Sequence, residues 1–280
     1  MSHLIKHFRY FFFLSGLVLF SFCNSADKTD DTTDVHDTST DNVIDKEQIS
    51  AQNIFNSIPA RAEIMRLIGD SKLEYDPAYL NNPDLSAKYS LENSRALNLG
   101  VYGADLSVSG AFDQTQESML FLKCVNVLAK NLGVSTAFDQ RMMDRMDAYK
   151  ENRDSTLEII AGAFRKADEV LKENNRPGTS ALILAGAWVE GIYISCKIAQ
   201  NPSSLNVIKT ILTQQESLGH LISMMKASNI STDAKYVFDE LEALKLSFDA
   251  ANKNGVNNLE GIKDICDKIF SLRKKVVETF

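Results

Sequence analysis

The sequence predicts an all-α protein, a multi-helix bundle, and three observations favour that class. Apolar residues recur at intervals of three and four along most of the chain after residue 47, as in the stripe Leu157, Ile160 and Phe164. The alternating apolar runs between turns that mark strands and hairpins do not occur in the sequence. Only 5 of the 280 residues are proline, so few positions would break a long helix.

Periodicity and capping patterns set the expected boundaries. Helices are predicted over 47–57, 60–69, 84–109, 114–131, 136–150, 154–174, 180–200, 204–227, 232–252 and 257–278. Capping boxes are expected at Asp113/Gln116, Ser155/Glu158 and Asn257/Glu260. Glycines are expected to end helices at Gly133, Gly178 and Gly255.

The central part of the chain repeats weakly at an offset of 86 residues. GVY at 100–102 followed by Ser109 aligns with GAW at 186–188 followed by Ser195, and Leu132-Gly133 aligns with Leu218-Gly219. We therefore expect two similar four-helix units, 84–174 and 178–280, preceded by short helices within 47–83. Stacked helical hairpins of tetratricopeptide-like geometry are one such arrangement, although no period of about 34 residues is present.

The helix expected over 180–200 contains the run LILAGAWVEGIYI, which is apolar on every side except at Glu190. Helices of this kind lie at the centre of large bundles, and a membrane-spanning helix is the alternative. If 94–109 and 180–200 are equivalent central helices, Gly100 and Gly186 allow them to approach closely. Leucine at either glycine is then expected to destabilise the bundle, whereas alanine is expected to be harmless or stabilising.

The N-terminus has the pattern of an export signal, and residues 1–22 are expected to be a signal peptide. Basic residues precede an apolar run that ends at Phe22 and is too short to span a membrane. Cys23 follows, and a cysteine at this position resembles the lipobox of bacterial lipoproteins, whose thiol is acylated. Because Phe22 stands where that pattern prefers Gly or Ala, cleavage near Ala26 with loss of Cys23 is the alternative.

Residues 23–46 are expected to be a lipidated cysteine followed by a disordered acidic tether. The segment 24–46 carries seven Asp and two Lys and is almost without apolar residues, so it cannot bury enough surface to offset the entropy of ordering. Its Asp residues do not have the spacing of a calcium-binding loop. The rest of the chain, 47–280, is expected to be a single all-α domain, which we call the body.

Charge and motif content exclude several function classes. The chain has 30 Lys and Arg against 37 Asp and Glu, a net charge of −7, so it lacks the basic surface of proteins that bind nucleic acid. The body contains one histidine, His220, near an expected helix end, where a capping or solvent role is favoured over catalysis. No nucleotide-binding, zinc-protease or nucleophile-elbow motif occurs, and neither a metal nor a cofactor is expected.

The body contains three cysteines, each within an apolar stretch: Cys124, Cys196 and Cys266. Export would place them in an oxidising compartment. Three thiols cannot form a complete disulfide framework, however, and no C-x-x-C pair is present. We expect buried free cysteines that pack as small apolar side chains, and whether any two of them pair stays open.

Asp105 and Glu190 are the most unusual polar residues of the body, since each is an acid within an apolar predicted helix. Each lies close in sequence to a large aromatic residue of the repeated segment, Tyr102 and Trp188. Two acids and two aromatic rings near a pseudo-twofold axis would suit a cleft for a cationic or sugar-like ligand. The alternative is structural, because buried acids commonly bind a neighbouring Arg or a helix end and such aromatic residues usually belong to the core.

Several segments resemble one group of exported proteins. They are SIP at 57–59, Glu63-Ile64, NLGVYGADL at 98–106 and FDQTQ at 112–116, and the likeness extends over most of the chain after residue 50. In these segments the chain resembles uncharacterised all-helical lipoproteins of the Bacteroidetes type. The resemblance implies export by a diderm bacterium and an outer-membrane or surface address, but it implies no activity and no catalytic residue.

Together these patterns predict a membrane-tethered, exported helical lipoprotein that acts as a binding or interaction module in the cell envelope. Its expected partners are the membrane, through a lipid anchor on Cys23, and an envelope protein, a glycan or a small molecule on the periplasmic or surface side. The alternative is a hydrolase that uses Asp105 and Glu190 as an acid/base pair. Carboxylates paired for glycoside hydrolysis lie about 5–10 Å apart in an open cleft, so their surroundings distinguish the two functions.

Overall fold

Helices form every regular element in residues 75–200, 205–253 and 259–280, which are the residues that the computed structural model describes. The all-α prediction is therefore confirmed for these ranges. All of these described residues belong to one compact unit. The expected leader, Cys23, the tether, the helices over 47–57 and 60–69, the stop at Gly255 and the cap at Asn257 lie outside the described residues.

The α-helices follow one another with short connections. They are α3 (Glu92–Ala111), α4 (Thr115–Leu132), α5 (Gln140–Ala148), α6 (Arg153–Glu173), α7 (Pro177–Ala199), α8 (Leu205–Thr213), α9 (Gln215–Ala227), α10 (Lys235–Lys253) and α11 (Leu259–Glu278). Short 3-10 helices are η2 (Pro77–Tyr79), η3 (Pro83–Leu85), η4 (Ser135–Phe138) and η5 (Thr232–Ala234). Several predicted ranges match one helix, but the helix expected over 84–109 begins only at Glu92, after η3. The helix expected over 204–227 is divided at Gln214, so His220 lies within α9 and not near a helix end.

Two expected capping boxes are wrong. The residue that caps α6 is Asn152, whose Oδ1 accepts a hydrogen bond from the backbone N–H of Ser155 at 3.0 Å. Ser155 is therefore inside the first turn instead of before it. Asp113 does not cap α4 either, because its backbone is left-handed (φ 56°) and its carboxylate binds Arg153.

Of the glycines expected to end helices, the structure describes Gly133 and Gly178, and the expectation is correct only for Gly133. Gly133 ends α4 with a φ of 77°, a left-handed conformation that glycine adopts without steric cost. Gly178 instead lies in the first turn of α7, directly after Pro177 at the first helical position. The left-handed residue between α6 and α7 is Asn175, with a φ of 56°.

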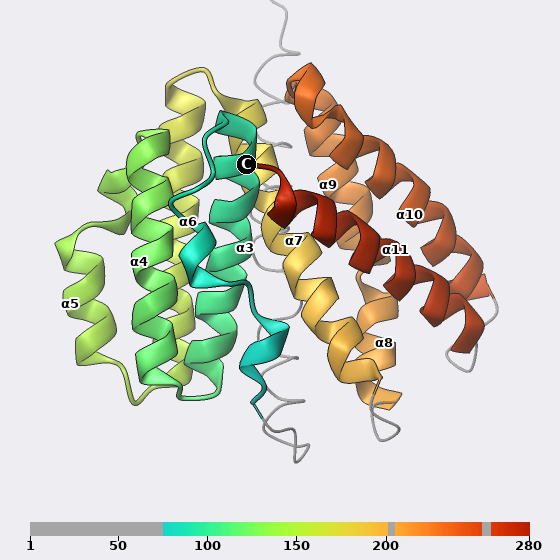
Figure 1. Ribbon diagram of the computed structural model, residues 1–280, viewed down its shortest axis with the longest axis horizontal. Coiled ribbons are helices and arrows are strands. Elements are labelled where there is room, and N and C mark those ends of the chain that lie inside the picture. Colours follow the sequence, from blue (N-terminus) through green and yellow to red (C-terminus); the bar gives the residue numbers. More distant parts are fainter. Residues whose placement is uncertain (1–74, 201–204, 254–258) are drawn as a thin grey trace, which may run out of the picture. The chain divides into compact units, whose positions relative to one another are not determined.

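Helices α3 and α7 lie against each other at the centre of the described part of the chain (Figure 1). On one side, α4 and α6 pack against α3; on the other, α8, α9 and α11 pack against α7. By length and composition alone α7 could cross a membrane, but 89% of its most apolar window is buried within the protein. It thus has the surroundings of a core helix, as its uniformly apolar sequence suggested.

The close approach of α3 and α7 depends on two glycines that face each other's helices. A Cβ at Gly100 would lie 2.0 Å from the carbonyl oxygen of Ile183, and a Cβ at Gly186 would lie 1.9 Å from the carbonyl oxygen of Leu97. The expectation that alanine is harmless at these positions is therefore wrong. The atoms that a methyl group would meet are backbone atoms, which cannot rotate away as a side chain can.

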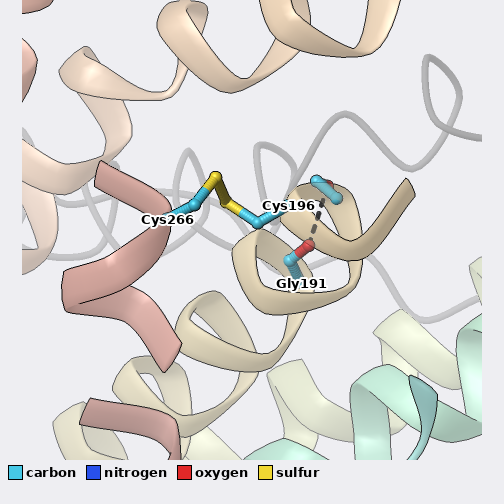
Figure 2. The surroundings of a disulfide bond; sticks show 4 residues. Gly191, Cys196 and Cys266 are labelled. Carbon is cyan, nitrogen blue, oxygen red and sulfur yellow. Dashed lines mark hydrogen bonds between the residues drawn. A yellow bond between two sulfur atoms is a disulfide. The ribbon is translucent and has the colours of Figure 1, made fainter. Parts of the chain in front are cut away.

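A disulfide bond joins Cys196 of α7 to Cys266 of α11 (Figure 2). The expectation that all three body cysteines are free is corrected for this pair, while Cys124 is buried and free as expected. The two sulfurs are brought together because α11 packs along α7. The bond closes a sequence separation of 70 residues, and cross-links of this kind typically stabilise a fold by about 2–4 kcal/mol.

Candidate functional site

Asp105 and Glu190 meet at the contact between α3 and α7. Both side chains are fully buried, with 0% of each residue exposed, and they lie near enough for the charge of Glu190 to raise the pKa of Asp105. The glycine-mediated approach of the two helices brings their side chains within reach. The structure thus places the two acids on facing helices, and neither of them has exposed surface there.

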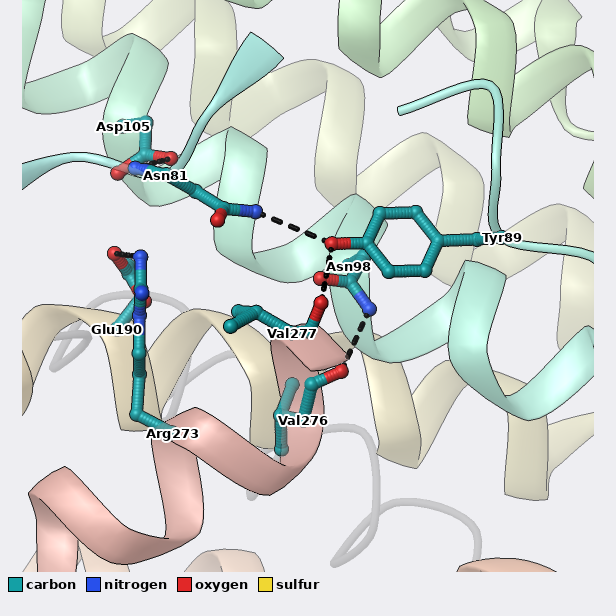
Figure 3. Close-up of polar contacts among 8 residues, drawn as sticks. All are labelled: Asn81, Tyr89, Asn98, Asp105, Glu190, Arg273, Val276 and Val277. Carbon is teal, nitrogen blue, oxygen red and sulfur yellow. Dashed lines mark hydrogen bonds and ion pairs between the residues drawn. The ribbon is translucent and has the colours of Figure 1, made fainter. Parts of the chain in front are cut away.

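Arg273 of α11 binds Glu190 through two hydrogen bonds (Figure 3). Its Nε donates to Oε2 at 2.9 Å and its Nη2 donates to Oε1 at 3.0 Å. The guanidinium group also lies over the ring of Tyr193, 4.5 Å from the ring centre. On the other acid, the backbone N–H of Asn81 donates to Oδ2 of Asp105 at 3.2 Å.

The end of α11 is held in place by polar side chains that also appear in Figure 3. The hydroxyl of Tyr89 donates to the carbonyl oxygen of Val277 at 3.0 Å, and Nδ2 of Asn98 donates to that of Val276 at the same distance. These bonds satisfy carbonyl groups that a helix leaves without partners at its C-terminus. They also fix the helix that carries Arg273.

Burial raises the pKa of both acids, because a charged carboxylate is disfavoured away from water. The pKa of Asp105 is raised well above its usual value, since this carboxyl also faces the charge of Glu190, whereas Arg273 favours the charged form of Glu190. Oδ1 of Asp105 accepts no hydrogen bond from any described residue. We interpret the pair as a protonated Asp105 beside an ionised Glu190, because the charge of Glu190 disfavours a second charge and Arg273 stabilises the first.

The two aromatic residues of the expected site belong to the core. Tyr102 and Trp188 are both 0% exposed. The hydroxyl of Tyr102 donates to the carbonyl oxygen of Asn82 at 2.7 Å, and Nε1 of Trp188 donates to Oγ of Ser217 at 3.0 Å. Neither ring therefore lines an open cleft for a cationic or sugar-like ligand.

This arrangement does not support the hydrolase alternative. Substrate and water would have to reach two carboxyl groups that have no exposed surface, one of which is bound on both oxygens by Arg273. Sequence reasoning named an arginine partner as the structural alternative but did not find Arg273. The available signal was a cation on the helix 257–278 directly after the apolar stripe residue Leu272.

A separate cavity of about 410 Å³ lies between α4, α5 and α6. We call it the α4–α5 groove. Its lining comprises apolar residues and small polar ones, Thr115, Met119, Leu122, Met143 and Met146 among them, and the charged residues Asp113, Asp144, Asp147 and Lys150. It exists because α5 packs on α6 and not closely on α4, with Phe138 and Met142 anchoring that region in the core. None of its lining residues was expected from the sequence to bind a ligand, because the groove results from how helices pack and not from a local pattern.

No family model, no curated protein and no solved structure matches this chain. Its function is therefore argued from the geometry of its own residues. Within the described ranges, no group of three or more His, Cys, Asp and Glu side chains could hold a metal ion. The one histidine of the body, His220, is half-buried within α9 and does not belong to the lining of the groove.

Proposed function

We propose that this protein is an exported, membrane-tethered helical module that binds a ligand in the α4–α5 groove. The observation that carries the proposal is the groove itself, an open cavity of about 410 Å³ with a mostly apolar lining. Its volume falls in the range of small-molecule sites, about 300–1,000 Å³. The acids expected to form a site are closed to solvent, so the groove is the better-supported location for binding.

Three features support the exported and tethered part of the proposal. The apolar leader ends at Cys23, and an acidic segment follows it. The disulfide between Cys196 and Cys266 fits an oxidising compartment, because disulfides are rare where thiols are kept reduced. The likeness to helical lipoproteins of the Bacteroidetes type points to the outer membrane, on its periplasmic or surface side.

Replacing Cys23 with alanine is expected to release the body from the membrane. The thiol is the proposed acylation site, and a lipid anchor supplies the membrane affinity that the acidic tether lacks. Cell fractionation and metabolic labelling with a fatty-acid analogue check this: only the wild type should carry label and sediment with membranes. A wild type without label, or a variant that stays with the membrane, would contradict the proposal.

Binding in the groove is tested by native mass spectrometry of protein purified gently from its own envelope. The wild type is expected to carry an added mass, and Thr115→Trp is expected to lose it, because Thr115 lines the groove and its replacement would fill the cavity. Thr232→Trp is the matched control, since Thr232 is also an exposed residue at a helix start but lies outside the groove. Equal added mass on all three proteins, or none on any, would refute the proposed site.

We also propose that the body consists of two related units, 84–174 and 178–280. The reciprocal contacts of Gly100 and Gly186 support this, because each glycine meets the residue three positions before the other: Ile183 and Leu97. The alignment of Leu132-Gly133 with Leu218-Gly219 gives no support to the two units, because Gly133 ends α4 whereas Gly219 lies within α9. The division of the equivalent helix into α8 and α9 is consistent with divergence of the second unit.

A further inference from the structure

We infer that the α4–α5 groove takes an organic cation with an apolar body, such as a quaternary ammonium or amine attached to a hydrocarbon group. The inference rests on the proposed binding function and adds the chemical class of the ligand. Two independent features of the groove lead to it. One is a wall rich in thioethers, and the other is a carboxylate at the rim that forms no ion pair with any residue that the structure describes.

The wall of the groove is built for an apolar body of irregular shape. It contains three methionines, Met119 from α4 with Met143 and Met146 from α5, and they stand beside Leu122. Methionine side chains are flexible and polarisable, so they adapt to different apolar surfaces. Met119 is 57% exposed although it is a large apolar residue, and a ligand in the groove would remove part of that surface from water.

Two carboxylates of the lining are already neutralised by cations of the protein. Nε of Arg153 donates to Oδ1 of Asp113 at 3.0 Å, and Nζ of Lys150 lies 3.3 Å from Oδ1 of Asp147. These two acids therefore leave little net charge for a ligand to meet. Among the described residues of the lining, Lys150 is the one basic residue. Because it is paired with Asp147, an anionic ligand would find no free cation there.

Asp144 differs from these two, since its Oδ1 accepts a hydrogen bond from the neutral amide of Gln140 at 2.8 Å. None of the ion pairs found among the described residues involves Asp144. Arg141 and Arg145 are exposed residues of α5 that do not belong to the lining. A cationic group above the apolar wall would thus find one uncompensated carboxylate at the rim.

The test is a titration of the Cys23→Ala chain with three probes that share an eight-carbon tail: octyltrimethylammonium, octanol and octanoate, all below micelle-forming concentrations. Calorimetry gives the affinities, and the ε-methyl NMR signals of the methionines give the location. The cation is expected to bind about two- to five-fold more tightly than octanol, the gain typical of one partly exposed charge pair, and octanoate more weakly than octanol. The signals of Met119, Met143 and Met146 should shift, whereas those of the buried Met224 and Met225 in α9 should not.

Asp144→Asn is expected to remove the preference for the cation while leaving the affinity for octanol unchanged, and to fold normally because Asp144 is exposed. Asp233→Asn, an exposed acid outside the groove, is the matched control and should change nothing. Equal affinities for the three probes in the wild type, or a preference that survives Asp144→Asn, would overturn the assignment of a cation. Octanol binding without discrimination would leave the proposed binding function standing, whereas no binding of any probe, or shifts confined to other methionines, would contradict both.

Discussion

Replacing Gly186 with alanine is expected to destabilise the protein by about 3 kcal/mol or more, at or beyond the upper end of what overpacking a core usually costs. The added Cβ would stand 1.9 Å from the carbonyl oxygen of Leu97 and 2.7 Å from its carbonyl carbon. Both are backbone atoms of α3, so the clash is relieved only if α3 and α7 move apart. Gly100→Ala should behave alike, because its Cβ would stand 2.0 Å from the carbonyl oxygen of Ile183.

The matched control is Gly219→Ala within α9, where an added Cβ would meet nothing within 4 Å. Glycine in the interior of a helix costs about 0.5–1 kcal/mol relative to alanine, so this variant should be slightly more stable than the wild type. Denaturant unfolding of the three variants gives the comparison. If Gly186→Ala were as stable as the wild type, α3 and α7 could not be packed as closely as described.

Replacing Glu190 with glutamine is expected to cost about 3 kcal/mol, near the lower end of the values for breaking a buried ion pair. The amide cannot neutralise Arg273, whose side chain is only 14% exposed. Arginine stays protonated in proteins, so the positive charge remains in the core. The loss is limited because Asp105 can give up its proton and supply a negative charge nearby.

Asp105→Asn is the contrasting variant, because asparagine copies the hydrogen bonds of a protonated aspartate. Its Oδ1 can accept from the N–H of Asn81, and its side chain places no second charge beside Glu190. The raised pKa of Asp105 means that the folded protein binds this proton more tightly than the unfolded chain. The free energy of unfolding contributed by this group is therefore greatest below its ordinary pKa of about 3.9 and falls as the pH rises through the folded value.

The free energy of unfolding of Asp105→Asn relative to that of the wild type should therefore increase as the pH rises. At acid pH, where the wild type keeps its proton on Asp105 in both states, the variant should have its least favourable value relative to the wild type. Carboxylates whose pKa is lowered, such as Glu92 and Asp264, are present in both proteins and cancel in the difference. Denaturant unfolding of both proteins, at pH values from below the ordinary aspartate pKa of about 3.9 up to neutral, measures this difference in the free energy of unfolding. A difference that does not change with pH would mean that Asp105 carries no extra proton in the folded state.

The fold class could be predicted from the sequence because helical periodicity is a local property. The predicted helix boundaries were wrong where two local patterns compete. The apolar period continues through Gln214, so the sequences of α8 and α9 look like one helix. Gly178 follows Pro177, and the proline at the first helical position was the stronger signal. Asn152 lies three residues before Ser155, and either could cap α6 by composition alone.

The acid pair was only half predictable. An acid inside an apolar helix is visible in the sequence, and this drew attention to Asp105 and Glu190. Their meeting depends on how α3 crosses α7, and their cation comes from Arg273, 83 residues from Glu190. The α4–α5 groove was not predictable at all, since it exists because α5 packs on α6 and leaves a space beside α4.

The central claim is that Asp105 and Glu190 form a closed structural pair in which Asp105 holds a proton. The most direct test is the carboxyl carbon chemical shift of Asp105, followed by NMR from acid to neutral pH and assigned by comparison with Asp105→Asn. A closed pair predicts a midpoint well above the ordinary aspartate pKa of about 3.9. A midpoint at or below that value would mean that the carboxyl is ionised like an exposed acid, and the closed pair would be contradicted.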